Sequence, residues 1–504
     1  MKFIVIIVAL LFSFIGCHQE SIIRDYSQVS ELKRVSPESQ GVSSRAVMDY
    51  IDSLMAFPQT EIHSVIILRH GRVISELYPS PYNPDYGHPL FSCSKTFVAA
   101  AVGIAINEQL IGLDDCVLDF FPEINRNSLD PSVYRITIED LLTMRSGLKV
   151  DWQIRSDSTN WIRAYFSRPL AFKPGKRFVY DSMNSYILSA IVQRVTGKQL
   201  IEYLKEKVFD EMNITEAKWE ESPEHISTGG WGLYMKPESM AKFGHLLLCR
   251  GMWNRKQLIP AEWVDNMMRK HVKNAYGDHY CFHMWTCSYK GSVRADGAYG
   301  QFIYIIPDKD MVITMTQCNN ANLKKQEQLI WNILLSGISD EEHTDEVSSK
   351  ELNNNRLPNY SLPILEGKRD SSIFNNFKGH TINLKQNLLG WKSIRLSSDS
   401  AETIKMVIVD SVGRVGDIAL GYHKWEISPI GVLPLNPRIN TKNRFSLFTN
   451  QFHAGGCYAW KDDGLYVKIH FVDWVSSILL HFFLCGDDIH IVANTNYMDD
   501  DILL

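Results

Sequence analysis

Two residues of this 504-residue chain, Ser92 and Lys95, have the types and the spacing of a catalytic pair. They lie three positions apart, so on a helix both side chains would project from one face. A serine hydroxyl becomes a nucleophile when a neighbouring group accepts its proton. A lysine can accept that proton when burial or nearby cations lower its pKa. The free N–H groups of a helix N-terminus would also stabilise an oxyanion, so the pair predicts nucleophilic catalysis by Ser92.

The same spacing also has a structural interpretation, in which Ser92 caps a helix and Lys95 is a solvated residue of its first turn. The residues that follow favour the catalytic interpretation. Apolar side chains recur at positions 97, 98, 101, 104, 105 and 106, which predicts a long buried helix. A lysine without a task is costly at the start of such a helix.

Further segments, in the same chain order, resemble the serine β-lactamase and penicillin-binding-protein superfamily. The likeness is closer to its class C branch, with the family VIII esterases and 6-aminohexanoate-dimer hydrolases. Ser92-Cys-Ser-Lys95 has the form of that branch's Ser-x-x-Lys motif. The other similar segments are residues 141–148, 174–180, 184–190, 229–234 and 240–244, so the resemblance covers about residues 40–336. It implies an α/β (α+β) fold, an antiparallel sheet flanked by helices with an all-α subdomain.

The resemblance also implies a role for each residue of the site. Ser92 would be the acylated nucleophile, and Lys95 would assist its deprotonation. Tyr180 would move a proton between Ser92, Lys95 and the leaving group. The backbone N–H groups of Ser92 and Ala298 would form the oxyanion hole. Taken alone, Tyr180 is more typical of a core aromatic residue whose hydroxyl is hydrogen-bonded. No metal or organic cofactor is implied.

The segment around Tyr180 departs from the family's pattern. The usual triplet is Tyr-x-Asn, whose Asn contacts the substrate, whereas this chain has Tyr180-Asp181-Ser182. A Tyr-x-Ser triplet is similar to the aminohexanoate-hydrolase side of the family. Ser182 can still donate a hydrogen bond to a substrate. Ser182 and the nearby Asn184 are therefore the candidate substrate-binding residues of this segment.

A second departure affects the motif that is usually Lys-Thr-Gly or His-Thr-Gly. It aligns with Ala295-Asp-Gly297, in which Gly297 keeps the backbone close to the substrate but the cation is missing. That cation helps to hold the carboxylate of a β-lactam. Its replacement by Ala295 argues against an efficient β-lactamase. Arg294 is one residue away and, on a strand, would point to the opposite face.

The pattern along the chain predicts the elements that position these residues. Strands are expected at 63–69, 72–78, 280–289, 301–306 and 311–316, and helices at 138–144, 184–196, 237–248 and 324–335. His70-Gly71 is typical of the tight turn of a hairpin. Strands at both ends with helices between them predict one α/β body, residues 41–336, with an all-α insertion at about 114–260. Residues 337–358 are predicted to be a linker.

Residues 359–504 have a different pattern, with short apolar or alternating segments at 404–409, 465–471, 477–483 and 489–493. Turn residues separate these segments, so we expect an antiparallel β barrel or sandwich. Added domains of this kind in the family look lipocalin-like. The four tryptophans of this part either pack its core or form a carbohydrate- or lipid-binding face; they are Trp391, Trp425, Trp460 and Trp474.

The N-terminus has the pattern of a secretory signal peptide, with Lys2 followed by an apolar run over residues 3–15. Gly16-Cys17 looks like the end of a bacterial lipobox, so Cys17 would be lipidated after removal of residues 1–16. Residues 17–40 would then be a tether. This predicts an exported, membrane-anchored lipoprotein on the periplasmic or cell-surface side, at the outer membrane. The alternative is a signal cut elsewhere, with Cys17 incidental.

Composition excludes several other classes of protein. The chain is 45% hydrophobic and 22% charged, which is typical of folded globular proteins. Its net charge of −5 is a poor match for a nucleic-acid backbone. Apart from Cys17, most of the nine cysteines are expected to be buried free thiols. Cys281 and Cys287 lie near two histidines, but alternate residues of a strand face opposite ways, so no metal site is predicted.

These observations favour an exported serine hydrolase that acts through an acyl-enzyme on ester or small amide substrates. Within the enzyme class, the alternative is a penicillin-recognising D-amino-acid peptidase or amidase, or a weak β-lactamase. Outside it, the alternative is a binding protein that kept the fold and lost turnover, which the changes at Ser182 and Ala295 leave open. The intact set of Ser92, Lys95 and Tyr180 argues against loss of activity.

Overall fold

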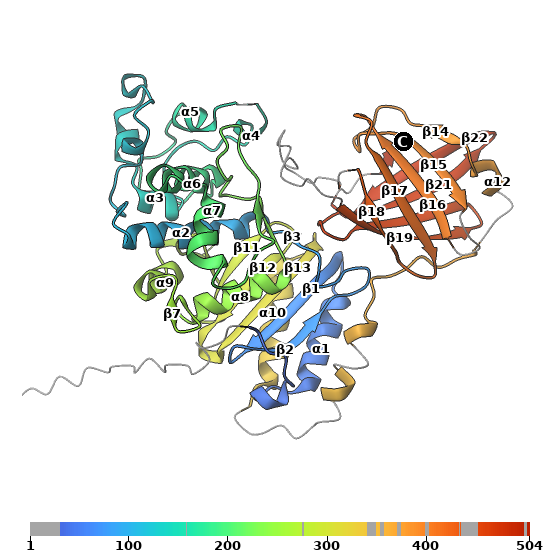
Figure 1. Cartoon of the computed structure of the whole chain (residues 1–504), viewed down its shortest axis with the longest axis horizontal. Helices are drawn as coiled ribbons and strands as arrows, with labels where there is room; N and C mark the ends of the chain where they lie inside the picture. The colour runs from blue at the N-terminus through green and yellow to red at the C-terminus, as the bar shows by residue number, and fades with distance from the viewer. Residues whose placement is uncertain are drawn as a thin grey trace, which may run out of the picture.

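The computed structural model describes residues 31–157, 159–274, 277–339, 349–352, 357–369, 374–398, 403–432, 434, 452–497 and 501–504. The predicted signal peptide, Cys17, and the tether up to residue 30 lie outside these residues, as does part of the predicted linker. Figure 1 shows a helix-and-sheet body and, beside it, a strand-rich C-terminal body coloured orange to red. The predicted fold class is thereby confirmed. In the described part of the chain, every helix is too short or too polar to cross a bilayer.

An antiparallel sheet of eight strands forms the centre of the first body, in the order β2-β1-β13-β12-β11-β10-β9-β8. The strands are β1 (Thr60–Arg69), β2 (Arg72–Leu77), β8 (Val272–Lys273), β9 (His279–Tyr280), β10 (Trp285–Thr286), β11 (Val293–Gly297), β12 (Gln301–Ile306) and β13 (Met311–Asn319). Strands β1 and β2 form the expected hairpin. His70 and Gly71 have φ angles of 51° and 68°, the left-handed conformations that a tight hairpin turn requires.

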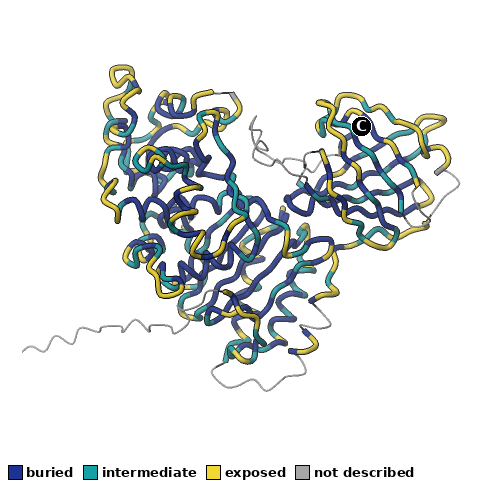
Figure 2. The backbone as a smooth tube through the Cα atoms, viewed as in Figure 1, coloured by how far each residue is buried: buried dark blue, intermediate teal, exposed yellow. Residues whose placement is uncertain are grey.

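Helices cover both faces of this sheet, and Figure 2 shows the strands between them as buried. On one face, α1 (Ser44–Met55) and α10 (Leu323–Leu329) lie against apolar side chains of β1, β12 and β13. On the other face lies α8 (Pro237–Leu248). Gly244 lets α8 approach closely, because an added Cβ would lie 2.6 Å from the Val312 side chain. The sheet is therefore enclosed, and the face that α8 covers shares one apolar core with the helical region.

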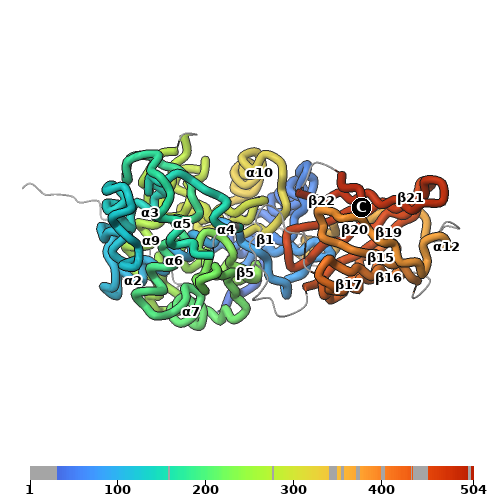
Figure 3. Tube along the Cα trace, turned by 90° about the horizontal axis from the view of Figure 1, so that it is seen from above, coloured from blue at the N-terminus to red at the C-terminus, as the bar shows by residue number. Residues whose placement is uncertain are grey.

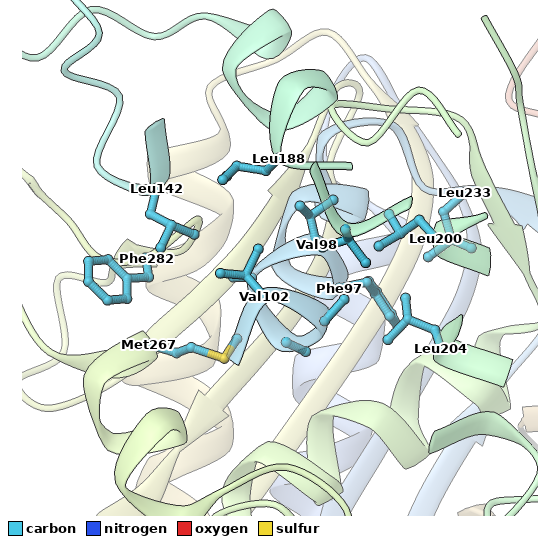
Figure 4. Close-up of a cluster of buried hydrophobic side chains, with 14 of the residues drawn as sticks. Phe97, Val98, Val102, Leu142, Leu188, Leu200, Leu204, Leu233, Met267 and Phe282 are labelled. Carbon is cyan, nitrogen blue, oxygen red and sulfur yellow. The ribbon is translucent and has the colours of Figure 1, made fainter. Parts of the chain in front are cut away.

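Helix α2 (Ser94–Asn107) connects the sheet to the helical region and is buried at every residue from 94 to 105. Figure 4 shows apolar side chains of neighbouring elements around Phe97, Val98 and Val102. The remaining helices are α3 (Ile138–Leu142), α4 (Ile154–Asp157), α5 (Trp161–Phe166), α6 (Ser182–Thr196), α7 (Leu200–Leu204) and α9 (Ala261–Met268). Short strands join this region in two small sheets: β3 (His88–Pro89), β5 (Leu233–Met235) and β4 (Lys218–Trp219), and β6 (Met252–Trp253) with β7 (Lys256–Gln257).

The prediction of one strand over residues 280–289 is wrong. The chain instead forms the short strands β9 and β10, which pair antiparallel through Tyr280 and Trp285. The turn between them includes His283, whose φ angle is 57° and whose side chain is buried. The apolar composition of this segment suggested a strand, whereas its tertiary contacts fold it back on itself.

The C-terminal body is one curled sheet of ten strands. They are β14 (Thr381–Asn383), β15 (Trp391–Ser398), β16 (Thr403–Asp410), β17 (Val415–Tyr422), β18 (Glu426–Ile430), β19 (Phe452–Lys461), β20 (Gly464–Phe471), β21 (Ser477–Cys485), β22 (Asp488–Thr495) and β23 (Ile502–Leu503). Neighbours are antiparallel except β17 and β19, which pair in parallel. Three of the four tryptophans, Trp391, Trp460 and Trp474, are buried in the apolar core of this sheet. Core packing therefore explains these three.

Figures 1 and 3 show β1 on the side of the first body that faces the C-terminal strands. A partly buried polar contact joins the two bodies there. The Glu61 carboxylate accepts hydrogen bonds from Lys468 Nζ at 2.8 Å, Ser477 Oγ at 2.9 Å and Asn496 Nδ2 at 2.7 Å. The Tyr82 ring lies between them, stacked on His63 and edge-on to His470. The interface is thus built from specific hydrogen bonds as well as apolar packing.

Candidate active site

Ser92 lies in the 3₁₀ turn Phe91–Cys93 immediately before α2, and Lys95 lies in the first turn of that helix. Ser92 is partly exposed, whereas Lys95 is 1% exposed. Phe91 has a φ angle of 47°, a strained conformation for a residue with a bulky side chain. Strain of this kind persists only where surrounding packing holds it. The Phe91 ring is held edge-on against Tyr299, at 5.5 Å between centroids.

The Lys95 amine is positioned to accept a proton from Ser92. Its Nζ lies 2.9 Å from Ser92 Oγ and donates to the Gly230 carbonyl oxygen at 2.5 Å. Burial lowers the pKa of Lys95 to about 7, although the nearby Asp181 carboxylate acts in the opposite direction. A large fraction of the lysine is therefore neutral near neutral pH, which is the form that can act as a base. Gly230 has to be glycine for this contact, because an added Cβ would lie 2.4 Å from the Ser182 carbonyl oxygen.

Tyr180 completes the cluster. The Lys95 amine lies over its ring, 4.8 Å from the centroid, and its hydroxyl is a hydrogen-bond partner of Ser92. Burial raises the pKa of Tyr180 far above its usual value, and the hydrogen bond with Ser92 only partly opposes this. The hydroxyl therefore stays protonated, so Tyr180 can relay a proton but not serve as a standing phenolate. The rings of Tyr280 and Trp285 fix its orientation.

A buried ion pair, which the sequence did not reveal, holds the segment after Tyr180. Asp181 accepts from Arg168 Nη1 at 2.8 Å, and both side chains are less than 5% exposed. The other carboxylate oxygen of Asp181 caps α6 by accepting from the Met183 N–H at 3.0 Å. An Asp just before a helix is a recognisable N-cap. Its pairing with Arg168, which follows the end of α5, has no local signal.

Gly297 and Ala298 lie where strand β11 passes the turn that carries Ser92. An added Cβ on Gly297 would be 2.3 Å from the Leu90 carbonyl oxygen, so only glycine allows this approach. Ala298 is the first residue after the strand, and Tyr299 follows with a φ angle of 63°. The backbone segments that carry the Ser92 and Ala298 N–H groups are therefore neighbours, as an oxyanion hole requires.

The side chains of β11 alternate as the sequence predicted. Ala295 is 1% exposed and packs in the core cluster that also contains α2, so it presents no charge to the site. Arg294 and Asp296 lie on the opposite face, where Arg294 Nε donates to Asp296 Oδ2 at 3.0 Å. Burial raises the pKa of Asp296, and Arg294 and Lys95 act in the opposite direction.

The two candidates on α6 have different surroundings. Ser182 is 5% exposed and lies against Gly230, whose carbonyl holds Lys95. Asn184 is completely buried, and its Oδ1 accepts a hydrogen bond from the Tyr165 hydroxyl at 2.9 Å. This contact gives Asn184 a structural role in joining α5 and α6. Its contact with a substrate stays a prediction.

His283 is a further residue that the sequence did not place at the site. Its Nε2 lies 3.0 Å from Ser185 Oγ, and its carbonyl oxygen accepts from Thr96 Oγ1 at 2.9 Å. Burial lowers its pKa to about 3, and the nearby Lys95 acts in the same direction. His283, in the β9–β10 turn, thus contacts α2 through its carbonyl oxygen and α6 through its neutral imidazole. The sequence showed this histidine only as a neighbour of two cysteines.

No set of three or more His, Cys, Asp or Glu side chains that could hold a metal ion occurs among the described residues. The eight cysteines in the described ranges are all free, and four of them are buried: Cys93, Cys281, Cys318 and Cys457.

Comparison with known proteins places this geometry in a family. Residues 49–336 match the family described as Beta-lactamase. The 6-aminohexanoate-dimer hydrolase of Paenarthrobacter ureafaciens is 24% identical over 307 residues, which cover 56% of this chain and 77% of that protein. The lovastatin esterase of Penicillium rubens is 24% identical over 155 residues, covering 26% and 39%. A solved Bacillus anthracis structure that bears the 6-aminohexanoate-dimer hydrolase name has a TM-score of 0.51 at 20% identity, covering 61% and 87%.

The fold, the matched family and these relatives define the class of the protein, a serine hydrolase of the β-lactamase type. The chain belongs to the beta-lactamase family, whose matched region includes the segments that carry Ser92, Lys95, Tyr180 and Ala298.

Proposed function

We propose that the protein hydrolyses esters or small amides through an acyl-enzyme on Ser92. The observation that carries this proposal is the contact between Ser92 Oγ and a buried lysine whose pKa lies at about 7. Two relatives with hydrolase names support the reaction class, namely the 6-aminohexanoate-dimer hydrolase and the lovastatin esterase.

Acylation begins when neutral Lys95 accepts the Ser92 proton, directly or through the Tyr180 hydroxyl, as Ser92 Oγ attacks the substrate carbonyl carbon. The oxyanion lies between the backbone N–H groups of Ser92 and Ala298. The tetrahedral intermediate collapses when the bond to the leaving group breaks. Tyr180 donates its proton to that group and regains one from Lys95, so the proton taken from Ser92 leaves with the alcohol or amine.

Deacylation repeats these steps with water in the place of Ser92. Lys95 and Tyr180 take a proton from the water as its oxygen attacks the acyl carbon. The bond to Ser92 Oγ then breaks, and Ser92 regains its proton. Both half-reactions need Lys95 neutral at the start, so the activity should rise with pH through the pKa of this lysine.

The test is the intact mass of the purified protein after incubation with a fluorophosphonate probe, with Ser92→Ala as the matched control. We expect one adduct on the wild type and none on the variant. Tyr180→Phe should retain the fold but lower kcat/KM for a neutral ester by about 10²-fold or more, the usual contribution of a positioned proton donor. A wild type that forms no adduct and hydrolyses no ester would refute the proposal and favour a binding protein.

We also propose, from the sequence, that the protein is exported and held on a membrane through lipidated Cys17. A multiply acylated cysteine supplies enough buried CH₂ groups for stable anchoring. Membrane fractionation of cells that express the full chain and its Cys17→Ala variant tests this. The wild type should sediment with membranes and the variant should not. An equally membrane-bound variant would contradict the lipid anchor.

A further inference from the structure

Asp296 places a carboxylate beside the catalytic cluster, at a position that the proposed reaction does not use. It lies two residues before Ala298, and its side chain is 25% exposed, whereas the preceding Ala295 is buried in the core. It precedes Gly297, whose added Cβ would lie 2.3 Å from the Leu90 carbonyl oxygen, so Asp296 lies beside the turn that carries Ser92. Its charge also acts on Lys95 and Tyr180. A substrate held at the Ala298 N–H therefore lies near a partly solvated carboxylate.

Arg294 binds Asp296 but does not cancel the negative charge of the group, because the arginine also contacts a second carboxylate, Glu327. Its Nε donates to Asp296 Oδ2, while its Nη1 donates to the Thr286 carbonyl oxygen at 2.9 Å and lies 3.7 Å from Glu327 Oε1. One cation is thus shared between two carboxylates, which leaves this group with a formal charge of −1. Among the described residues, Asp296 makes this one side-chain hydrogen bond and makes it through Oδ2. Oδ1 is available to a ligand.

We propose that Asp296 selects substrates that carry a cationic group, such as an ammonium, on the leaving-group side of the scissile bond, and disfavours a carboxylate there. The leaving-group side follows from Tyr180, which is proposed to protonate the leaving group. Its ring lies 5.8 Å from that of Trp285, and Trp285 is the cross-strand partner of Arg294, which holds Asp296. The inference rests on the proposed function and deepens it. Strand β11 lacks the family's cation at Ala295 and carries the carboxylate of Asp296 instead. The protein should therefore prefer a cationic substrate rather than an anionic one.

A positive charge, that of Arg155, could favour the opposite kind of substrate. Arg155 also acts on Lys95, and its guanidinium lies over the rings of Trp152 and Trp231, 4.6 Å and 5.1 Å from their centroids. If Arg155 dominated recognition on the leaving-group side, the protein would prefer a carboxylate there. The two possibilities predict opposite orders for charged substrates.

Three butyrate esters of similar size distinguish them: choline butyrate, its neutral isostere 3,3-dimethylbutyl butyrate, and 2-carboxyethyl butyrate. We expect kcat/KM of the wild type to be about fivefold higher for the choline ester than for the neutral ester, the effect of a partly exposed ion pair. The carboxylate ester should be the poorest of the three. This comparison needs no variant, so it holds even if a substitution at Asp296 prevents folding.

Asp296→Asn tests the residue itself, because the amide keeps an oxygen for Arg294 and loses the charge. The choline-to-neutral ratio should fall to near one. Asp278→Asn is the matched control, since it removes one carboxylate charge from an ion pair with Lys324, at 3.1 Å, that does not include Arg294. It should leave both the ratio and the neutral-ester activity unchanged.

Several results would overturn the inference: no preference for the choline ester in the wild type, a preference for the carboxylate ester, or an equal loss of preference in Asp278→Asn. Failure of the proposed function gives a different result, because the wild type would then hydrolyse none of the three esters and Ser92 would take up no fluorophosphonate.

Discussion

Replacement of Lys95 by methionine should make the protein more stable and inactive. The methionine keeps most of the length of the side chain but removes the buried charge. The pKa of Lys95 falls from 10.5 to about 7 on folding because burial disfavours the charged form. This change in pKa means that the buried charge of Lys95 destabilises the folded protein by about 4 to 5 kcal/mol at low pH. Loss of the hydrogen bonds to Ser92 and Gly230 offsets part of it, at about 1 to 3 kcal/mol. We therefore expect a net gain of about 2 kcal/mol at pH below 7.

The sign of the pH dependence follows from proton binding. Between pH 7 and 10.5 the unfolded chain holds the Lys95 proton and the folded chain does not, so the free energy of unfolding of the wild type rises with pH in this window. The cost of burying the charge is complete below about pH 7 and is relieved above it. The difference in the free energy of unfolding between Lys95→Met and the wild type should therefore shrink as the pH rises toward 10. Measurements end there because tyrosines titrate near that pH.

Chemical denaturation of both proteins from pH 6 to pH 10 gives the stability difference, and kcat/KM for a neutral ester gives the activity. Wild-type kcat/KM should rise with an apparent pKa near 7 and then level off. A variant that is less stable than the wild type at pH 6, with a difference that does not change with pH, would refute the reasoning. So would a wild-type activity whose midpoint lies near 10.

Three further predictions concern other contacts. Asp181→Asn leaves Arg168 buried without its charge partner, and should lower the free energy of unfolding by about 3 to 5 kcal/mol in chemical denaturation, whereas a loss below 1 kcal/mol would contradict the role of the pair. Gly297→Ala forces β11 away from the Leu90 carbonyl, and should lower kcat about 10²-fold or more, with a smaller change in KM; unchanged kcat would exclude the oxyanion role. Burial raises the pKa of Glu61, but His470 and Lys468 lower it to about 2, so its stabilisation is complete above about pH 4.5 and is lost as the pH falls through 2. Glu61→Gln should therefore lower Tm at pH 7 and match the wild type near pH 2, and an equal difference at both pH values would contradict this.

The sequence predicted those parts of the site that depend on local spacing. Ser92 and Lys95 meet because they are three residues apart at the start of a helix, and Arg294 faces away from Ala295 because strands alternate. Contacts between distant segments were not predictable. Arg168 follows α5 and Asp181 precedes α6, and the fold of the chain alone brings them together.

The same limit explains the wrong prediction of one strand. The apolar residues of 280–289 have the composition of a strand, but the chain turns at the buried His283, which contacts Ser185 of α6. The hydrogen bond of Asn184 with Tyr165 likewise joins distant segments, and no local pattern reveals it.

The packing of Phe91 and Tyr299 indicates why the C-terminal sheet belongs to the hydrolase. Each residue adjoins a proposed oxyanion donor, Phe91 before Ser92 and Tyr299 after Ala298, and each has a positive φ angle that needs support. Their rings contact each other and are buried in the apolar cluster that otherwise consists almost entirely of C-terminal side chains. Ala298 packs against the same cluster. The strained backbone on both sides of the oxyanion hole is therefore held by the core of the added domain, so this domain is part of the frame of the active site.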